Sequence, residues 1–158
     1  MPSVAEKLGQ MAAQAAMVEG LVYGMESGGG YYNGYYVPDR NLMYTAQVLT
    51  QQLYPEFITS MREIAGGGLI MLPSSVKDFE NPEIARYIHA TQNSAVGTSE
   101  EKVKFMKLAW DAIGSEFASR HTQYEMFYAG AQFVTRGHAL RTYAVSYTHL
   151  RAHETIHY

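Results

Sequence analysis

The sequence predicts an all-α protein, a bundle of antiparallel helices joined by structured loops. Apolar residues recur at steps of three and four over long stretches of the chain, which is the spacing of one helix face. Segments rich in glycine, proline and serine separate these stretches, and the sequence contains no internal repeat. A length of 158 residues allows one domain with a buried core.

The first predicted helix covers residues 3–27. Ser3, with Glu6 three residues later, has the pattern of a capping box at the start of this helix. Alanines at positions 12, 13, 15 and 16 favour close contact with another helix. The helical period stops at the glycines that follow, so we expect the helix to end near Ser27.

Residues 28–39, GGGYYNGYYVPD, predict a tight turn with extended flanks. Asn33-Gly34 is a favoured pair for a two-residue turn, and a pair of tyrosines lies on each side of it. The four tyrosines have two interpretations. They form an aromatic binding surface, or they belong to a loop that packs against a helix face; the second interpretation is the more common one for such a segment.

A second long helix is predicted from about Leu42 to Ile64, with Asp39 or Asn41 as its cap. Pro55 is expected to restart or kink this helix. Three glycines end it, and we expect Leu69 to Leu72 to form a short buried extended run.

The second half of the chain is also predicted to be helical. Asn81-Pro82 predicts the start of a short helix that runs through Tyr87. Thr98 and Glu101 have capping-box spacing before a third long helix, which is expected to continue irregularly as far as Gly130. One more helix is expected within residues 131–143.

Composition excludes several classes of function. The net charge of −3 and the absence of a long basic run argue against nucleic-acid binding. The absence of cysteine excludes disulfides, thiol catalysis and iron–sulfur ligation within this chain. No stretch approaches the roughly 20 apolar residues of a membrane span, and the first residues lack the features of a signal peptide. We therefore expect a cytoplasmic protein without a membrane partner.

Two segments carry more polar and glycine detail than a plain bundle requires. In GSEFASRHTQYEMFY (residues 114–128), Glu116 and Arg120 have the spacing of a helical ion pair, which is the simpler interpretation. The alternative directs Arg120 at a diphosphate, with Gly114 letting a cofactor lie against the backbone. In GGGLIMLPSS (residues 66–75), the glycines are either an ordinary helix stop or a place of close backbone approach, and the two serines could donate to a phosphate or ribose.

The segments WDAIGSEFASRHTQYEMFYAG and GLIMLPSS, the latter followed by KDFENPEI, resemble two landmarks of the 4-hydroxyphenylacetate 3-hydroxylase family of flavin-dependent monooxygenases. The resemblance implies a fold like that of acyl-CoA dehydrogenases, of which residues 1–144 would be the C-terminal helical bundle. It implies no metal site and no catalytic residue in this chain, because those residues lie mainly in other domains of the family. It implies an FAD contact along the chain from Gly114 to His121, formed by Gly114, Ser115, Glu116, Phe117, Arg120 and His121, with the loop from Gly68 to Ser75 as a weaker candidate.

The same resemblance implies partners. In the family, a separate flavin reductase supplies reduced FAD, a phenolic small molecule such as 4-hydroxyphenylacetate is hydroxylated ortho to its hydroxyl group, and the subunits usually form a homotetramer through this bundle. Two alternatives stay open. One is a flavoprotein like 4-hydroxybutyryl-CoA dehydratase, from a related branch. The other is a non-catalytic helical assembly module.

The end of the chain carries a string that fits H-E-x-x-H, HETIH at residues 153–157, which on a helix holds zinc and a general base. Residues 145–155, VSYTHLRAHET, also match the in-frame translation of an adapter used in transposase-based DNA libraries. No apolar helical period is present to seat a zinc helix, and no third ligand follows. We therefore interpret residues 145–158 as an artefactual tail and not as a metal site.

Overall fold

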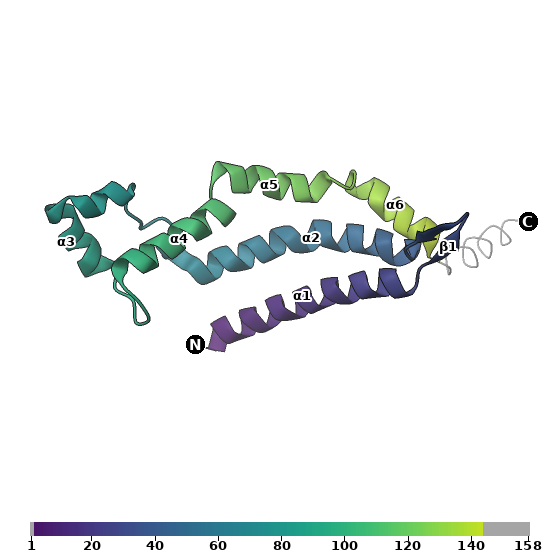
Figure 1. Cartoon of the computed structure of the whole chain (residues 1–158), viewed down its shortest axis with the longest axis horizontal. Helices are drawn as coiled ribbons and strands as arrows, with labels where there is room; N and C mark the ends of the chain where they lie inside the picture. Colours follow the sequence, from purple (N-terminus) through teal and green to yellow (C-terminus); the bar gives the residue numbers. More distant parts are fainter. Residues whose placement is uncertain (1, 144–158) are drawn as a thin grey trace, which may run out of the picture. The chain divides into compact units, whose positions relative to one another are not determined.

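The computed structural model describes residues 2–143, and its helices follow one another along nearly the whole of that range (Figure 1). The predicted all-α class is confirmed. None of the described helices is both long enough and apolar enough to cross a membrane. The elements in chain order are α1 (Pro2–Ser27), β1 (Gly30–Tyr32), β2 (Tyr35–Val37), α2 (Arg40–Ala65), η1 (Gly66–Leu69), η2 (Val76–Glu80), α3 (Pro82–Thr91), α4 (Ser99–Ile113), α5 (Glu116–Phe127) and α6 (Gln132–Thr142).

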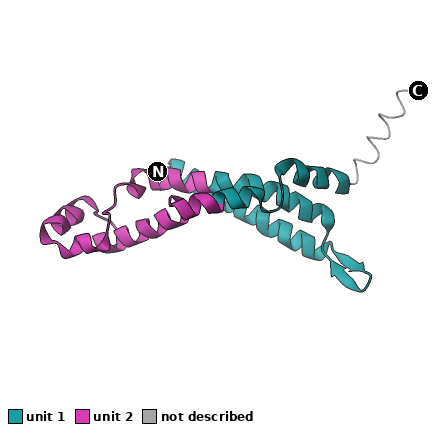
Figure 2. Cartoon of the chain, turned by 90° about the horizontal axis from the view of Figure 1, so that it is seen from above, with its two compact units in different colours: residues 1–57, 122–158 teal, residues 58–121 magenta. Residues whose placement is uncertain are grey.

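The chain divides into two compact units, coloured separately in Figure 2. Unit 1 comprises Met1–Phe57 and Thr122–Tyr158, and therefore contains α1, the two strands, most of α2, the end of α5 and α6. Unit 2 comprises Ile58–His121, with the end of α2, α3, α4 and the first turns of α5.

Polar contacts join the helices of unit 1. The side-chain amides of Gln10 and Gln14 on α1 both donate to Glu56 Oε1 on α2, at 2.8 and 3.0 Å. Among the described residues of this unit, the most deeply buried side chains are Gln51 and Thr135. Gln51 Nε2 donates to the Gly130 carbonyl at 2.8 Å, and Thr135 Oγ1 donates to Gln51 Oε1 at 2.9 Å. The network joins α2 to the start of α6. Because Gln51 and Thr135 are hydrogen-bonded, these contacts offset the cost of burying their polar groups.

Unit 2 has an apolar core. Gln92, at the end of α3, is also buried there and donates from Nε2 to the Met71 carbonyl at 2.7 Å, which holds the loop after η1. The buried apolar residues are Ile58, Leu69, Ala85, Ile88, Val103, Ile113 and Ala118.

Several predicted caps are confirmed. Asp39 Oδ1 accepts from the Leu42 amide at 2.8 Å at the start of α2. Asn81 caps α3 through its side-chain oxygen. Both hydrogen bonds of the Thr98–Glu101 capping box form at the start of α4. Side-chain oxygens accept from the first free amides of these three helices, so their boundaries follow from local sequence.

The predicted hairpin is confirmed as well. Strands β1 and β2 pair antiparallel, with Tyr31 opposite Tyr36 and Tyr32 opposite Tyr35. Asn33 and Gly34 have positive φ values of 51° and 82°, which a two-residue turn of this kind requires. We call residues 30–37 the tyrosine hairpin. Its four tyrosines are exposed, so the interpretation of a loop packed against a helix face is wrong.

Four other expectations are corrected. Ser3 lies inside α1, which begins at Pro2, so the Ser3–Glu6 capping box is wrong; proline tolerates a first helical position because it has no amide hydrogen to satisfy. The expected restart at Pro55 does not occur, because α2 runs through that residue.

The third correction concerns Leu69 to Leu72, which are not a buried extended run. The Ile70 and Met71 amides both donate to the Gly67 carbonyl at 3.1 Å, so the chain curls after η1. Ile70 is 77% exposed. Gly66, with φ of 55°, starts this curl in a conformation that suits glycine.

The expected third long helix is instead two helices, α4 and α5. The break lies at Gly114 and Ser115, whose amides both donate to the Trp110 carbonyl, at 2.8 and 2.9 Å. Ser115 Oγ then accepts from the Ala118 amide at 3.1 Å and so caps α5. The helix predicted within residues 131–143 is confirmed as α6.

Candidate functional site

Within unit 2, Trp110 lies between the two segments that the sequence singles out. Gly114 follows it by one helical turn, and a Cβ added at Gly114 would lie 2.5 Å from the indole ring. The absence of a side chain at Gly114 therefore allows the ring to lie against the backbone at the end of α4.

Two small cavities border this indole. A cavity of about 290 Å³ is lined by Trp110 and Gly114 from one segment and by Gly66, Leu69 and Ile70 from the other, with Arg62 at its side. A second, of about 250 Å³, is lined by Trp110, Lys107 and the loop from Leu69 to Ser74. The structure thus brings Gly114 of the first segment and residues of the second segment together around the Trp110 ring.

Two cations belong to this region, and the sequence analysis missed both. Arg62 Nε donates to the Ile113 carbonyl at 2.8 Å, across from α2 to the end of α4. Lys107 Nζ donates to the Ser74 carbonyl at 3.3 Å. Arg62 is one turn before the three glycines and Lys107 one turn before Asp111, but neither spacing forms a recognised motif. Only the three-dimensional contact joins them to the indole.

The predicted residues on α5 lie mainly on its solvent-facing side. The carboxylate of Glu116 and the guanidinium of Arg120 are 3.6 Å apart, with side chains 87% and 79% exposed. An exposed pair of this kind contributes little to stability, about 0.3–0.5 kcal/mol in similar helices. The predicted ion pair is present, and Arg120 nevertheless stays accessible to an anion.

Phe117 and His121 form an aromatic face beside that ion pair. Their rings are stacked, with centroids 6.2 Å apart and an interplanar angle of 12°. Phe117 is exposed, whereas His121 is half-buried. Ser115 has a structural role at the break between α4 and α5. Its hydroxyl donates to the Asp111 carbonyl and accepts from the Ala118 amide.

The serines of the loop from Gly68 to Ser75 have local partners. Ser74 Oγ donates to Asp78 Oδ2 at 3.2 Å. Ser75 Oγ accepts from the Lys77 amide, and the Ser75 amide donates to Asp78 Oδ2, so this residue caps η2. The structure therefore gives both serines a structural role, and the contribution of this loop to the site comes from its apolar residues around Trp110.

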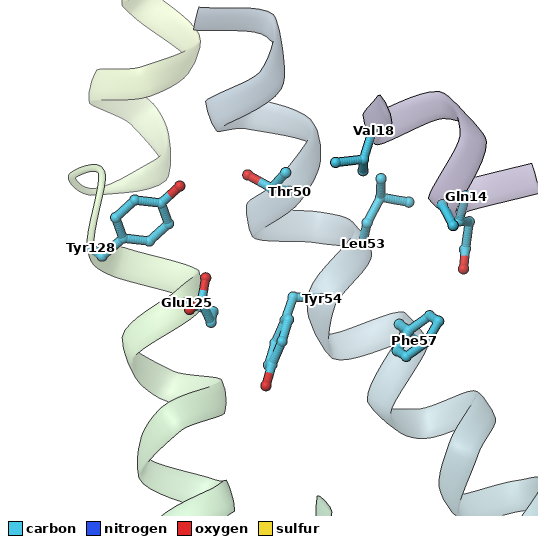
Figure 3. A pocket seen from close by; sticks show the side chains of 9 residues that line it. Gln14, Val18, Thr50, Leu53, Tyr54, Phe57, Glu125 and Tyr128 are labelled. Carbon is cyan, nitrogen blue, oxygen red and sulfur yellow. The ribbon is translucent and has the colours of Figure 1, made fainter. Parts of the chain in front are cut away.

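Unit 1 contains a separate pocket of about 360 Å³ between α1, α2 and α5, shown in Figure 3. Its walls are mainly apolar, with Tyr54, Glu125 and Tyr128 among the lining side chains. Burial, together with the nearby Glu125 carboxylate, raises the pKa of the Tyr54 phenol. No sequence motif pointed to this pocket, because its residues come from three separate parts of the chain.

Among residues 2–143, no three histidine, cysteine, aspartate or glutamate side chains are arranged to hold a metal ion. The HETIH string and the rest of residues 145–158 lie outside the described residues. The described surface of α5 instead offers an exposed aromatic ring and an exposed guanidinium within one helical turn. Such a combination suits a planar aromatic ligand that carries an anionic group.

The chain also matches a known protein family along its length. Residues 1–157 match the family described as 4-hydroxyphenylacetate 3-hydroxylase C terminal.

Curated relatives agree with this match. The oxygenase component of 4-hydroxyphenylacetate 3-monooxygenase from Pseudomonas aeruginosa is 39% identical over 112 residues, which cover 70% of this chain and 22% of the relative. The oxygenase component of 4-nitrophenol 2-monooxygenase from a Rhodococcus species is 31% identical over 114 residues, covering 72% of this chain and 22% of the relative. The chain therefore spans about a fifth of the length of the curated relatives it matches.

Solved structures show the same relationship. The oxygenase component of 4-hydroxyphenylacetate 3-monooxygenase, complexed with FAD and 4-hydroxyphenylacetate, matches 99% of this chain with a TM-score of 0.87 and 26% identity, and the match covers 33% of that structure. An archaeal 4-hydroxybutyryl-CoA dehydratase from N. maritimus matches 86% of this chain with a TM-score of 0.78 at 20% identity, covering 27% of that structure. The second likeness shows a shared fold alone.

Proposed function

The chain belongs to the 4-hydroxyphenylacetate 3-hydroxylase family, as its C-terminal domain. We therefore propose that it forms part of the oxygenase component of a two-component, FAD-dependent monooxygenase. The substrate is a phenol such as 4-hydroxyphenylacetate, hydroxylated ortho to its hydroxyl group, and a separate reductase supplies the reduced FAD. The observation that carries the proposal is the match of 99% of this chain to an oxygenase structure that holds both FAD and 4-hydroxyphenylacetate.

In this proposal, the chain contributes one wall of the flavin site. The proposed contact residues are Gly114, Ser115, Glu116, Phe117, Arg120 and His121. Of these, Gly114 lines a cavity of unit 2 together with Trp110 and Arg62. Reduced FAD, when bound, supplies the chemistry that activates oxygen.

The residues of the chain bind and orient the cofactor in this proposal. Phe117 and His121 offer a stacked aromatic face to a planar ring. Arg120 offers a guanidinium that can leave its exposed partner Glu116 for a more strongly charged diphosphate. No group of this chain is proposed to move a proton or attack the substrate, so its part in the reaction is positioning and oligomer contact.

A chimera tests this function. The matching segment of the Pseudomonas aeruginosa relative is replaced by this chain, and the purified protein is titrated with reduced FAD without oxygen. We expect binding, and hydroxylation of 4-hydroxyphenylacetate once oxygen is admitted. A folded chimera that binds no reduced FAD would overturn the proposal.

Arg120→Gln in the same chimera tests the site. Loss of a charge-assisted contact to an anion is worth about 1.5–3 kcal/mol, so affinity for reduced FAD should fall at least about tenfold. Arg136→Gln is the matched control, because Arg136 on α6 pairs with Gln132 in unit 1. If the two variants bind reduced FAD with equal affinity, Arg120 does not contact the cofactor.

A further inference from the structure

The pocket between α1, α2 and α5 shares no residue with the proposed flavin site. Its lining residues all belong to unit 1, whereas the proposed flavin contacts, within residues 114–121, belong to unit 2. Its volume of about 360 Å³ lies within the usual range of small-molecule pockets, about 300–1,000 Å³. The pocket is therefore large enough to hold a small ligand of its own.

Apolar and aromatic side chains form most of the pocket wall. Val18 comes from α1, and Leu53 and Phe57 come from α2 (Figure 3). The rings of Tyr54 and Tyr128 line the same pocket. A wall of this kind favours a flat apolar body, because burial of apolar area and contacts between aromatic rings both stabilise it. The body of a matching ligand is therefore an aromatic ring.

The charge of the pocket is negative. Of the described residues that line it, Glu125 alone is charged at neutral pH. In Figure 3 its carboxylate lies between the labelled rings of Tyr54 and Tyr128. The faces of tyrosine rings also attract cations. A carboxylate beside two tyrosine rings therefore favours a cationic group on the ligand and disfavours an anionic one.

The hydrogen-bonding groups of the lining favour a ligand that donates. Gln14 lines the pocket and donates from Nε2 to Glu56 Oε1 at 3.0 Å, whereas its buried Oε1 accepts no hydrogen bond from the described residues. Burial, and secondly the Glu125 carboxylate, raise the pKa of the Tyr54 phenol, which therefore stays protonated at neutral pH. An ammonium group offers three donors and no acceptor, so it matches this lining.

We propose that this pocket binds a small aromatic amine, with the ring against the apolar wall and the ammonium group beside the Glu125 carboxylate. The inference goes beyond the proposed function, because it assigns a ligand to residues outside the flavin site. Binding at this pocket involves no covalent step and needs neither flavin nor reductase, so it can be measured without them.

The first experiment compares three probes that share a phenylethyl body: the cation 2-phenylethylamine, the neutral 2-phenylethanol and the anion 3-phenylpropionate. Isothermal titration calorimetry with the 158-residue chain at neutral pH measures each dissociation constant. We expect the amine to bind with a dissociation constant below about 1 mM, at least about tenfold tighter than the alcohol, and the propionate not to bind. An amine that binds no tighter than the alcohol or the propionate would contradict the inference.

Glu125→Gln tests the proposed ammonium contact, because it removes the charge and keeps the size of the side chain. The affinity for 2-phenylethylamine should fall at least about tenfold, while the affinity for 2-phenylethanol should change by less than about twofold. Glu83→Gln, at an exposed site on α3 in unit 2, is the matched control with the same change in net charge. If the two variants bind the amine equally well, Glu125 does not hold the ammonium group and the inference is wrong.

Ala15→Leu tests the location of the site, and it does so even if Glu125→Gln fails to fold. Ala15 lines the pocket, so a larger side chain there should weaken binding of the amine and of the alcohol together. Ala16→Leu, at the next residue of α1 and outside the lining, is the matched control. Circular dichroism checks that each variant keeps its helices. Equal binding by the two leucine variants would place the probe elsewhere on the chain and refute the inference.

The site also fails if a chain with intact helices binds none of the three probes. That result leaves the proposed flavin function untouched, because the chimera measures flavin binding separately. A chimera that binds no reduced FAD likewise leaves the amine site untouched, since the two sites share no residue.

Discussion

The contact between Gly114 and Trp110 can be tested by adding one methyl group. Gly114→Ala places a Cβ 2.5 Å from the indole ring, so the ring must move. We expect a shift in tryptophan fluorescence, which reports this site alone because Trp110 is the single tryptophan of the chain. Gly67→Ala, where an added Cβ meets no atom within 4 Å, is the control and should leave the spectrum unchanged. An unchanged spectrum in Gly114→Ala would show that the ring does not occupy this position.

The raised pKa of Tyr54 predicts a specific loss of folding stability at alkaline pH. Burial first, and the Glu125 carboxylate second, raise its pKa above the usual 10.0, so the folded protein holds the phenolic proton more tightly than the unfolded chain. The resulting stability is fully present below pH 10.0 and falls as the pH rises through the folded pKa.

Tyr54→Phe should therefore flatten the loss of stability above pH 10.0, measured by urea unfolding at a series of pH values. Tyr87→Phe, at an exposed site, should retain the wild-type slope. Glu125→Gln should lower the Tyr54 pKa, visible in the ultraviolet absorbance of tyrosinate. If Tyr54→Phe and Tyr87→Phe give the same slope, the surroundings of Tyr54 do not raise the pKa of its hydroxyl in the folded protein.

Gln51 should be among the most sensitive positions of unit 1. Gln51→Ala removes two hydrogen bonds of a buried side chain and leaves the Gly130 carbonyl and the Thr135 hydroxyl without these partners. The expected cost is about 2–4 kcal/mol in the free energy of unfolding. Gln52→Ala, one residue along the same helix and exposed, should change it by less than about 0.5 kcal/mol. Similar urea midpoints for the two variants would contradict the importance of the buried network.

At the scale of the helices, the start of α4 offers a clean test of capping. Thr98→Ala removes the side-chain oxygen that accepts from the Glu101 amide, and should destabilise unit 2 by about 1 kcal/mol. Thr98→Ser keeps that oxygen and should recover most of the stability. Thermal unfolding followed by circular dichroism measures both. A serine variant as unstable as the alanine variant would assign the effect to the threonine methyl group instead.

Element boundaries set by local chemistry could be predicted from sequence. Asp39, Asn81 and Thr98 cap their helices through their own side chains, and Asn33-Gly34 forms its turn from two residues. The break at Gly114 and Ser115 could not be predicted in the same way. The apolar spacing continues through it, and the decision comes from the packing of the Trp110 ring and from the new cap at Ser115.

The candidate site shows the same division. The ion pair between Glu116 and Arg120 follows from helix spacing alone and is present. Arg62, by contrast, donates to the Ile113 carbonyl at the end of α4, 51 residues later in the sequence. No local pattern could reveal this contact. The serines at 74 and 75 look like phosphate donors in sequence, and the structure shows that both are used around η2.

At the scale of the whole molecule, we expect the chain alone to be inactive. Residues 1–144 should not hydroxylate 4-hydroxyphenylacetate when supplied with a flavin reductase, FAD and NADH, because the chain spans only a third of the solved oxygenase it matches. Product formation is measured by chromatography, and the intact Pseudomonas aeruginosa relative is the positive control. Turnover above the level of a reaction without the chain would show that the bundle by itself contains a complete active site.

The polar network of Gln51, Thr135 and Gly130 has a consequence for how α6 finds its place. Apolar helix faces can slide past each other by one turn, about 5.4 Å, with little change in contact area. Here such a slip would separate the Gln51 amide from the Gly130 carbonyl and leave the buried Gln51 side chain without this hydrogen bond. The network thus selects one register of α2 against α6 from several that would bury a similar surface area.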